Sequence, residues 1–125
     1  MFFCVLGFPH KIQHGDYFGG KLIGLCKILI DNSYRVNVYT THLHANYHKT
    51  RQEDFYLAHR TCQAYEVVQF IESTSNVETT DLTILLGDLN LTPDDLGFQL
   101  IRGILKLNDS FVDRLDKVKT STRRK

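Results

Sequence analysis

Residues 85–92, Leu-Leu-Gly-Asp-Leu-Asn-Leu-Thr, decide how the rest of the sequence is interpreted. The apolar, partly β-branched run 83–86 predicts a buried strand that delivers Asp88 and Asn90 to a strand end. If the backbone stays extended, these two side chains point to the same side and place a carboxylate beside a carboxamide. Such a pair can bind a metal ion or contact an anionic oxygen. Gly, Asp and Asn are also ordinary turn residues, and on this tetrapeptide alone a plain turn is the favoured interpretation.

A helix start is predicted directly after this stretch. Thr92 is a suitable N-cap and Pro93 a suitable first helical residue. Two acids in the first turn and two leucines spaced as a hydrophobic staple agree with this start: Asp94, Asp95, Leu91 and Leu96. Beyond Gly103, residues 105–112 predict one further short strand.

The earlier part of the chain predicts a β-hairpin and a long helix. Residues 22–30 and 34–42 are strand-like, and Asp-Asn-Ser at 31–33 is turn chemistry. A helix is predicted over 53–73, with its buried stripe made of Leu57, Thr61, Ala64, Tyr65, Val68 and Ile71. The polar residues predicted to lie away from that stripe are Arg60, Gln63 and Glu66.

Composition excludes several classes of protein. The 125 residues, of which 42% are hydrophobic, suit one domain, and the net charge of +1 gives no argument for nucleic acid. Three cysteines without a close pair predict neither a disulfide framework nor a thiolate zinc site, which fits a reducing compartment. We expect no signal peptide and no transmembrane segment in this chain. The basic residues 116–125 predict a solvated, disordered tail.

Two further segments carry candidate chemistry. The glycine-containing run 15–21 includes Asp16 and Lys21 and could hold a phosphate or lipid headgroup, although a solvated surface turn is favoured on composition. His42 and His44 would share one face if the strand continued, and with His48 they suggest zinc. The spacing to the next ligands does not match a zinc cluster, so zinc is disfavoured.

Three motifs together resemble the endonuclease/exonuclease/phosphatase superfamily, and within it the neutral sphingomyelinases of the membrane-bound animal type. The motifs are His-Gly-Asp-Tyr-Phe-Gly-Gly-Lys at 14–21, Tyr-Thr-Thr-His-Leu-His-Ala-Asn-Tyr at 39–47, and Leu-Gly-Asp-Leu-Asn at 86–90 followed by Pro-Asp-Asp-Leu-Gly at 93–97. The helix segments Tyr-Leu-Ala-His-Arg at 56–60 and Gln-Ala at 63–64 also look like that family's helix. The resemblance runs from about residue 7 to residue 112.

This resemblance implies an α/β (α+β) fold that forms part of a four-layer α/β/β/α sandwich, DNase I-like. Residues 1–115 would be a partial catalytic domain, and 116–125 a basic tail. The family's metal-binding glutamate would lie upstream of residue 1, and its general-base histidine would follow Asp88, whereas every histidine here precedes Asp88: His10, His14, His42, His44, His48 and His59. We therefore expect a fragment that is inactive alone, with strand edges and apolar faces left uncovered.

The implied activity is hydrolysis of sphingomyelin, or a related choline phospholipid, to ceramide and phosphocholine with Mg²⁺. By resemblance, Asp88 and Asn90 would lie at the magnesium ion. Asp88 would orient or help deprotonate the attacking water, and Asn90 would contact the phosphate and a metal-bound oxygen. His42 would hydrogen-bond the charge that develops on the phosphorus oxygens. Asp16 and Lys21 would belong to a loop that rearranges to switch the site on.

Membrane association, with the catalytic domain facing the cytosol, is expected for the full-length parent enzyme, and no nucleic acid partner is expected. Two alternatives remain open. One is another phosphodiesterase of the superfamily, a nuclease or inositol phosphatase. The other is a non-catalytic protein that binds lipid headgroups.

Overall fold

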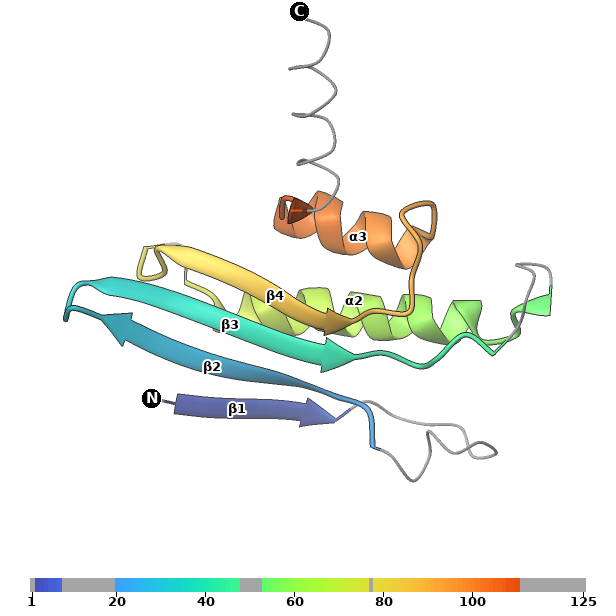
Figure 1. The fold of residues 1–125 in the computed structure, drawn as a ribbon, viewed down its shortest axis with the longest axis horizontal. Helices are drawn as coiled ribbons and strands as arrows, with labels where there is room; N and C mark the ends of the chain where they lie inside the picture. The colour runs from blue at the N-terminus through green and yellow to red at the C-terminus, as the bar shows by residue number, and fades with distance from the viewer. Residues whose placement is uncertain (1, 8–19, 48–52, 77, 111–125) are drawn as a thin grey trace, which may run out of the picture.

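A computed structural model describes residues 2–7, 20–47, 53–76 and 78–110, which form one mixed sheet with helices packed against one face (Figure 1). The spatial order of the strands is β1-β2-β3-β4. The elements are β1 (Phe2–Gly7), β2 (Leu22–Ile30), β3 (Tyr34–His42), α2 (Leu57–Thr74), β4 (Leu82–Asp88) and α3 (Leu96–Leu105). The α/β class implied by the sequence is confirmed, and the second sheet of a four-layer sandwich stays a prediction.

The predicted hairpin is confirmed at both strands and is the centre of the sheet. β2 and β3 pair antiparallel from Ile23 opposite Thr41 to Ile30 opposite Tyr34. The turn between them places Asp31 and Asn32 in the left-handed region, at φ 48° and 58°. Asp and Asn tolerate that conformation better than other side chains, which is why this tripeptide can reverse the chain so tightly.

β4 lies parallel to β3, from Val36 opposite Leu82 to His42 opposite Asp88. Parallel neighbours need a long crossover connection, and α2 provides it. Because the two strands are parallel, the C-terminal ends of β3 and β4 lie side by side at one edge of the sheet (Figure 1).

The core lies between the sheet and the two helices. Ile23 and Leu25 of β2 and Tyr39 of β3 are at most 3% exposed and contact the buried side of α2. Ile101 brings α3 into the same cluster, and α3 packs mainly against α2. The ring of Tyr39 meets that of Phe70 edge-on, with centroids 6.2 Å apart.

The buried stripe of α2 differs from the predicted one. Arg60 and Gln63, expected to lie away from the core, are each 1% exposed, whereas Tyr65 is 51% exposed. Specific partners make this possible. The Arg60 guanidinium forms a two-point ion pair with the carboxylate of Asp54, and Gln63 accepts a hydrogen bond from the main chain of His44. Hydrophobic periodicity cannot foresee such partners, because they lie outside the helix.

The predicted start of α3 is wrong. The helix begins at Leu96 with Asp95 in the N-cap position, so neither Thr92 nor Pro93 takes its expected place. The Asp95 carboxylate accepts a hydrogen bond from Thr92 N–H (2.8 Å), and Asp95 N–H donates to the Thr92 carbonyl (3.0 Å). These bonds form a turn over 92–95 that delays the helix. Leu96 is 57% exposed, so the predicted staple is also absent.

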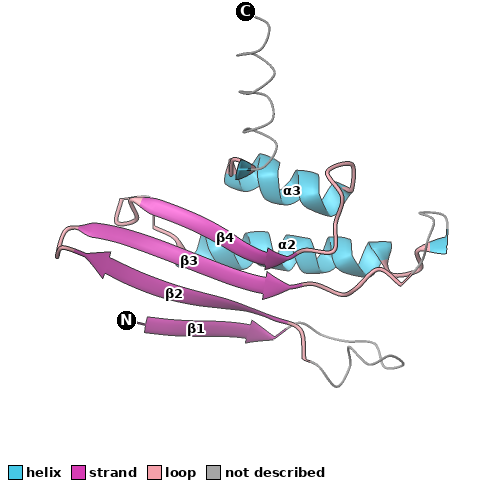
Figure 2. Cartoon of the chain, in the orientation of Figure 1, coloured by secondary structure: helices cyan, strands magenta, loops and turns pink. Residues whose placement is uncertain are grey.

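The short strand predicted over 105–112 does not form in its described part. Leu105 is the last residue of α3, and Lys106 ends the helix with φ 53°. Residues 107–109 are irregular (Figure 2). Residues 111 and 112 lie outside the described part of the chain.

The sheet face opposite the helices is apolar and uncovered among the described residues. By strand alternation this face carries the exposed side chains of Leu22, Ile28, Leu82 and Leu86, which are 37–52% exposed. The expectation of an uncovered apolar face is therefore confirmed for the part of the chain that the structure describes. We call this surface the open face of the sheet.

Candidate functional site

The candidate site begins with His42 and Asp88, the last residues of β3 and β4. They are register partners in the parallel pair, so their backbones lie about 4.8 Å apart. Both residues are exposed, and strand alternation along β3 places His42 on the open face. The fold thus sets an imidazole beside a carboxylate at the edge of the sheet.

Gly87 lets β4 approach β3 closely at this point. Its φ is +121°, a conformation that side chains rarely adopt, and an added Cβ would lie 1.9 Å from the Thr41 carbonyl oxygen. No other residue fits there without moving the backbone. The glycine therefore fixes where Asp88 emerges next to His42.

Asn90 reaches the site by a turn rather than by strand alternation. Its φ is 50°, so the predicted extended path past Asp88 is wrong. Asp88 Oδ1 accepts a hydrogen bond from Asn90 N–H at 2.9 Å, and Asn90 Nδ2 donates to the Leu43 carbonyl at 3.1 Å. The turn interpretation and the functional one are thus compatible, because the turn itself brings Asn90 between the ends of β3 and β4.

The oxygens of Asp88 and Asn90 suit a magnesium ion. Among the described residues, Asp88 Oδ2 and Asn90 Oδ1 accept no hydrogen bond, and both are hard oxygen ligands. In the same part of the chain, no group of three or more His, Cys, Asp or Glu side chains could hold a metal. Magnesium usually keeps several waters and binds through one or two protein oxygens, so this donor set fits it as a partial site.

His44 does not join His42, contrary to the shared face predicted for them. β3 ends at His42, and His44 is 5% exposed, its ring stacked on Tyr56 with centroids 4.4 Å apart. The His59 ring meets the His44 ring edge-on, with centroids 5.4 Å apart, and Nδ1 of His44 lies 3.0 Å from the Ala45 carbonyl oxygen. This histidine packs in an aromatic cluster. The third member of the disfavoured zinc set, His48, lies outside the described residues.

Of the two loop residues, the structure describes Lys21 alone. It follows Gly20, whose φ is +54°, and is 7% exposed, so the expectation of a solvated surface lysine is wrong. Asp16 lies outside the described residues, and the pairing of these two positions stays a prediction.

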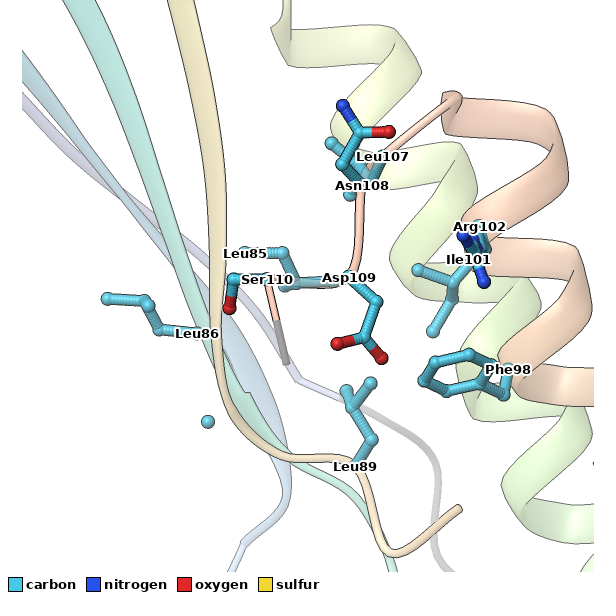
Figure 3. Close-up of a pocket in the computed structure, with 11 residues that line it drawn as sticks. Leu85, Leu86, Leu89, Phe98, Ile101, Arg102, Leu107, Asn108, Asp109 and Ser110 are labelled. Atoms are coloured by element: carbon cyan, nitrogen blue, oxygen red, sulfur yellow. The ribbon is translucent and has the colours of Figure 1, made fainter. Parts of the chain in front are cut away.

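A pocket of about 290 Å³ lies between β4, α3 and residues 107–110 (Figure 3). Figure 3 shows Phe98 and Ile101 on one side of it and Leu85 on the other, with Asp109 pointing into the space between them. Asp88 and Asn90 do not line it. The pocket is therefore separate from the strand-end site. It could not be predicted, because the sequence suggested a strand where 107–109 are irregular.

Gln63 is a residue near the site whose position the sequence did not predict. Its Oε1 accepts a hydrogen bond from His44 N–H at 2.9 Å, just past the end of β3. A signal was present, since Gln63 is followed by Ala64 and Val67 at core spacing, but its polar side chain argued for the solvent side.

Neither helix in the described part of the chain is long and apolar enough to span a membrane.

Comparison with known proteins identifies relatives. No protein-family model matches the chain. It is 52% identical over 105 residues to a Caenorhabditis elegans protein named as a candidate neutral sphingomyelinase. The aligned region covers 84% of this chain and 23% of that protein. It is 44% identical over 110 residues to sphingomyelin phosphodiesterase 2 of Homo sapiens, which covers 88% of this chain and 25% of that protein.

A more distant relative is the inositol phosphosphingolipids phospholipase C of Schizosaccharomyces pombe, 27% identical over 106 residues, or 85% of this chain and 24% of that protein. The chain spans about a quarter of the length of the curated relatives it matches. The resemblance stated from the three motifs is confirmed. Over most of its length, this chain is a homologue of about one quarter of the Caenorhabditis elegans protein and of human sphingomyelin phosphodiesterase 2.

Proposed function

We propose that this chain carries part of the catalytic site of a magnesium-dependent phosphodiesterase that hydrolyses sphingomyelin to ceramide and phosphocholine. The observation that carries the proposal is the pairing of His42 with Asp88 at adjacent strand ends, with Asn90 turned back between them. This arrangement lies in a segment that matches sphingomyelin phosphodiesterase 2 at 44% identity.

The chemistry of a phosphodiester explains why these residue types belong together. The phosphodiester is an anion that repels hydroxide, so its hydrolysis needs positive charge and hydrogen-bond donors at the oxygens that gain charge. Mg²⁺ held by Asp88 and Asn90 would supply that charge and acidify a water molecule. Asp88 would orient that water and help in its deprotonation, with Asn90 N–H bound to the other carboxylate oxygen.

Asn90 and His42 would contact the phosphate. One N–H of the Asn90 side chain is committed to the Leu43 carbonyl, which leaves the carbonyl oxygen Oδ1 and a second N–H for the metal and the substrate. His42 is exposed next to Asp88 and would donate to an oxygen of the transition state.

We propose in addition that the whole protein works at a membrane surface and faces the cytosol, because its substrate would be a bilayer lipid. Asp16 and Lys21 would switch the site, as the resemblance implies. We also propose that the 125-residue chain is inactive without the carboxylate and the histidine base that it lacks, and that it takes no nucleic acid.

Inositol phosphosphingolipids are the second candidate substrates, favoured by the fission-yeast relative at 27% identity. Both candidates are phosphodiesters of a sphingoid lipid and differ in the alcohol on the far side of the phosphate. The shared residues would act on the phosphate alone, so they cannot discriminate between the two headgroups.

A substrate panel tests the proposal. The chain, and the same chain carrying any sequence that adjoins it in its reading frame, are assayed with sphingomyelin, an inositol phosphosphingolipid, phosphatidylcholine and duplex DNA, with Mg²⁺ and with EDTA. We expect the extended form alone to release phosphocholine from sphingomyelin, and only with Mg²⁺. Cleavage of DNA, or activity unchanged by EDTA, would contradict the proposal.

A further inference from the structure

A single peptide group connects α2 to the candidate site. The peptide between residues 43 and 44 contributes both the Leu43 carbonyl and the His44 N–H. The carbonyl accepts a hydrogen bond from Asn90 Nδ2 (3.1 Å), and the N–H donates to Gln63 Oε1 (2.9 Å). Gln63 and Asn90 therefore bind opposite ends of the same peptide plane.

We infer that Gln63 is a positioning residue that orients the Asn90 side chain through this peptide. The inference rests on the proposed function of Asn90 and adds to it a residue on a different element. A peptide whose N–H is hydrogen-bonded is a better acceptor at its carbonyl, so the Gln63 contact strengthens the Asn90 contact as well as fixing its direction.

The burial of Gln63 supports this role. Its side chain is 1% exposed, and its Nε2 is buried without a hydrogen-bond partner among the described residues. A buried unsatisfied donor typically costs about 1–3 kcal/mol. A leucine or methionine would avoid that cost at this place in the core, so the acceptor Oε1 is the part of the side chain that the structure uses.

The hydrogen bond from Asn90 to Leu43 also fixes the direction in which the Asn90 amide faces. With one N–H held by the Leu43 carbonyl, the Asn90 amide cannot flip without losing that bond, so its Oδ1 stays turned away from Leu43. Without Gln63, the neighbouring 42–43 peptide keeps its Leu43 N–H bond to the Asp88 carbonyl (2.9 Å), but the 43–44 peptide loses its support on the α2 side. The Asn90 amide would then sample several orientations.

The test compares Gln63→Met, which removes the acceptor at nearly constant volume, with Gln63→Glu, which keeps it. Gln69→Met is the matched control, because Gln69 is exposed on the same helix. In the 125-residue chain, NMR follows the Asn90 side-chain amide and hydrogen exchange of the His44 amide. We expect Gln63→Met to shift or broaden the Asn90 signals and speed His44 exchange, Gln63→Glu to restore both, and Gln69→Met to leave them unchanged.

In protein active on sphingomyelin, Gln63→Met should lower kcat by about ten- to a hundredfold with little change in KM, since misplacing a contact by about 1 Å costs that order of rate. If Gln63→Met does not unfold cooperatively, Gln63→Asn, which withdraws the acceptor by one methylene, replaces it.

Wild-type-like Asn90 signals and His44 exchange in a folded Gln63→Met or Gln63→Asn variant would overturn the inference. The NMR result decides it even if the extended wild-type protein proves inactive, an outcome that would contradict the proposed function instead.

Discussion

Leu43 N–H donates to the carbonyl of Asp88 at 2.9 Å, which continues the parallel pairing of β3 and β4 one residue past His42. The strand ends are therefore joined beyond the last register pair. The position of the Asp88 carboxylate depends on the backbone of β3 as much as on its own strand, and changes that separate the two strands should disturb the site.

Gly87→Ala is expected to destabilise the fold severely. The new Cβ would lie 1.9 Å from the Thr41 carbonyl oxygen, and the φ of +121° would be strained for any side chain. Urea unfolding of both proteins measures the loss of the free energy of unfolding.

The matched control for that substitution is Gly103→Ala in α3, where a Cβ would meet nothing within 4 Å. Alanine is the better helix former, so this variant should gain about 0.5–1 kcal/mol. If Gly87→Ala and Gly103→Ala changed the free energy of unfolding in the same direction, the packing described here would be contradicted.

Arg60→Met should cost about 3–5 kcal/mol of unfolding free energy, because it leaves the Asp54 carboxylate without its buried partner. The two side chains are 1% and 3% exposed, so water cannot compensate. Chemical denaturation provides the measurement. Arg35→Met, at an exposed arginine, should stay within about 0.5 kcal/mol of the wild type. Equal effects at the two positions would show that the ion pair is not buried in solution.

Glu66→Gln should raise stability near neutral pH. Burial raises the pKa of the Glu66 carboxyl above its ordinary value of 4.5, so over the window above 4.5 the folded state holds more protons than the unfolded state. The stability of the wild type therefore falls as pH rises through that window. Glu66→Gln removes this dependence.

The advantage of Glu66→Gln over the wild type should shrink as the pH is lowered through that window toward 4.5. Thermal melts of both proteins from pH 4 to pH 7 follow the difference. An advantage that is the same at every pH would have another cause than the charge.

Strands β2, β3 and β4 were predicted from the sequence, whereas β1 and much of the packing were not. Alternation and an Asp-Asn-Ser turn are local signals, and they placed β2 and β3 correctly. Gln63 was misplaced because its burial depends on His44, 19 positions away along the chain. Arg60 was misplaced for a similar reason, since its partner Asp54 lies before the helix begins.

The candidate site was likewise predicted only in part. His42 and Asp88 lie where strand ends were predicted, because each is the last residue of its strand. The extended backbone predicted from Asp88 to Asn90 was wrong, because Asn90 N–H donates a hydrogen bond to the Asp88 carboxylate and Asn90 adopts the left-handed conformation. Period-2 alternation assumes an extended chain and cannot detect such a turn.

The role of Asp88 and Asn90 in catalysis is tested by the rate of Mg²⁺-dependent phosphocholine release from sphingomyelin micelles. The wild type, Asp88→Ala and Asn90→Ala are compared in the 125-residue chain and in the form extended along its reading frame. Asp94→Ala, at an exposed carboxylate before α3, is the control. We expect activity in the extended form alone, lowered about 10²- to 10⁴-fold by Asp88→Ala and strongly by Asn90→Ala, and unchanged by Asp94→Ala. Wild-type rates in Asp88→Ala would contradict that catalytic role.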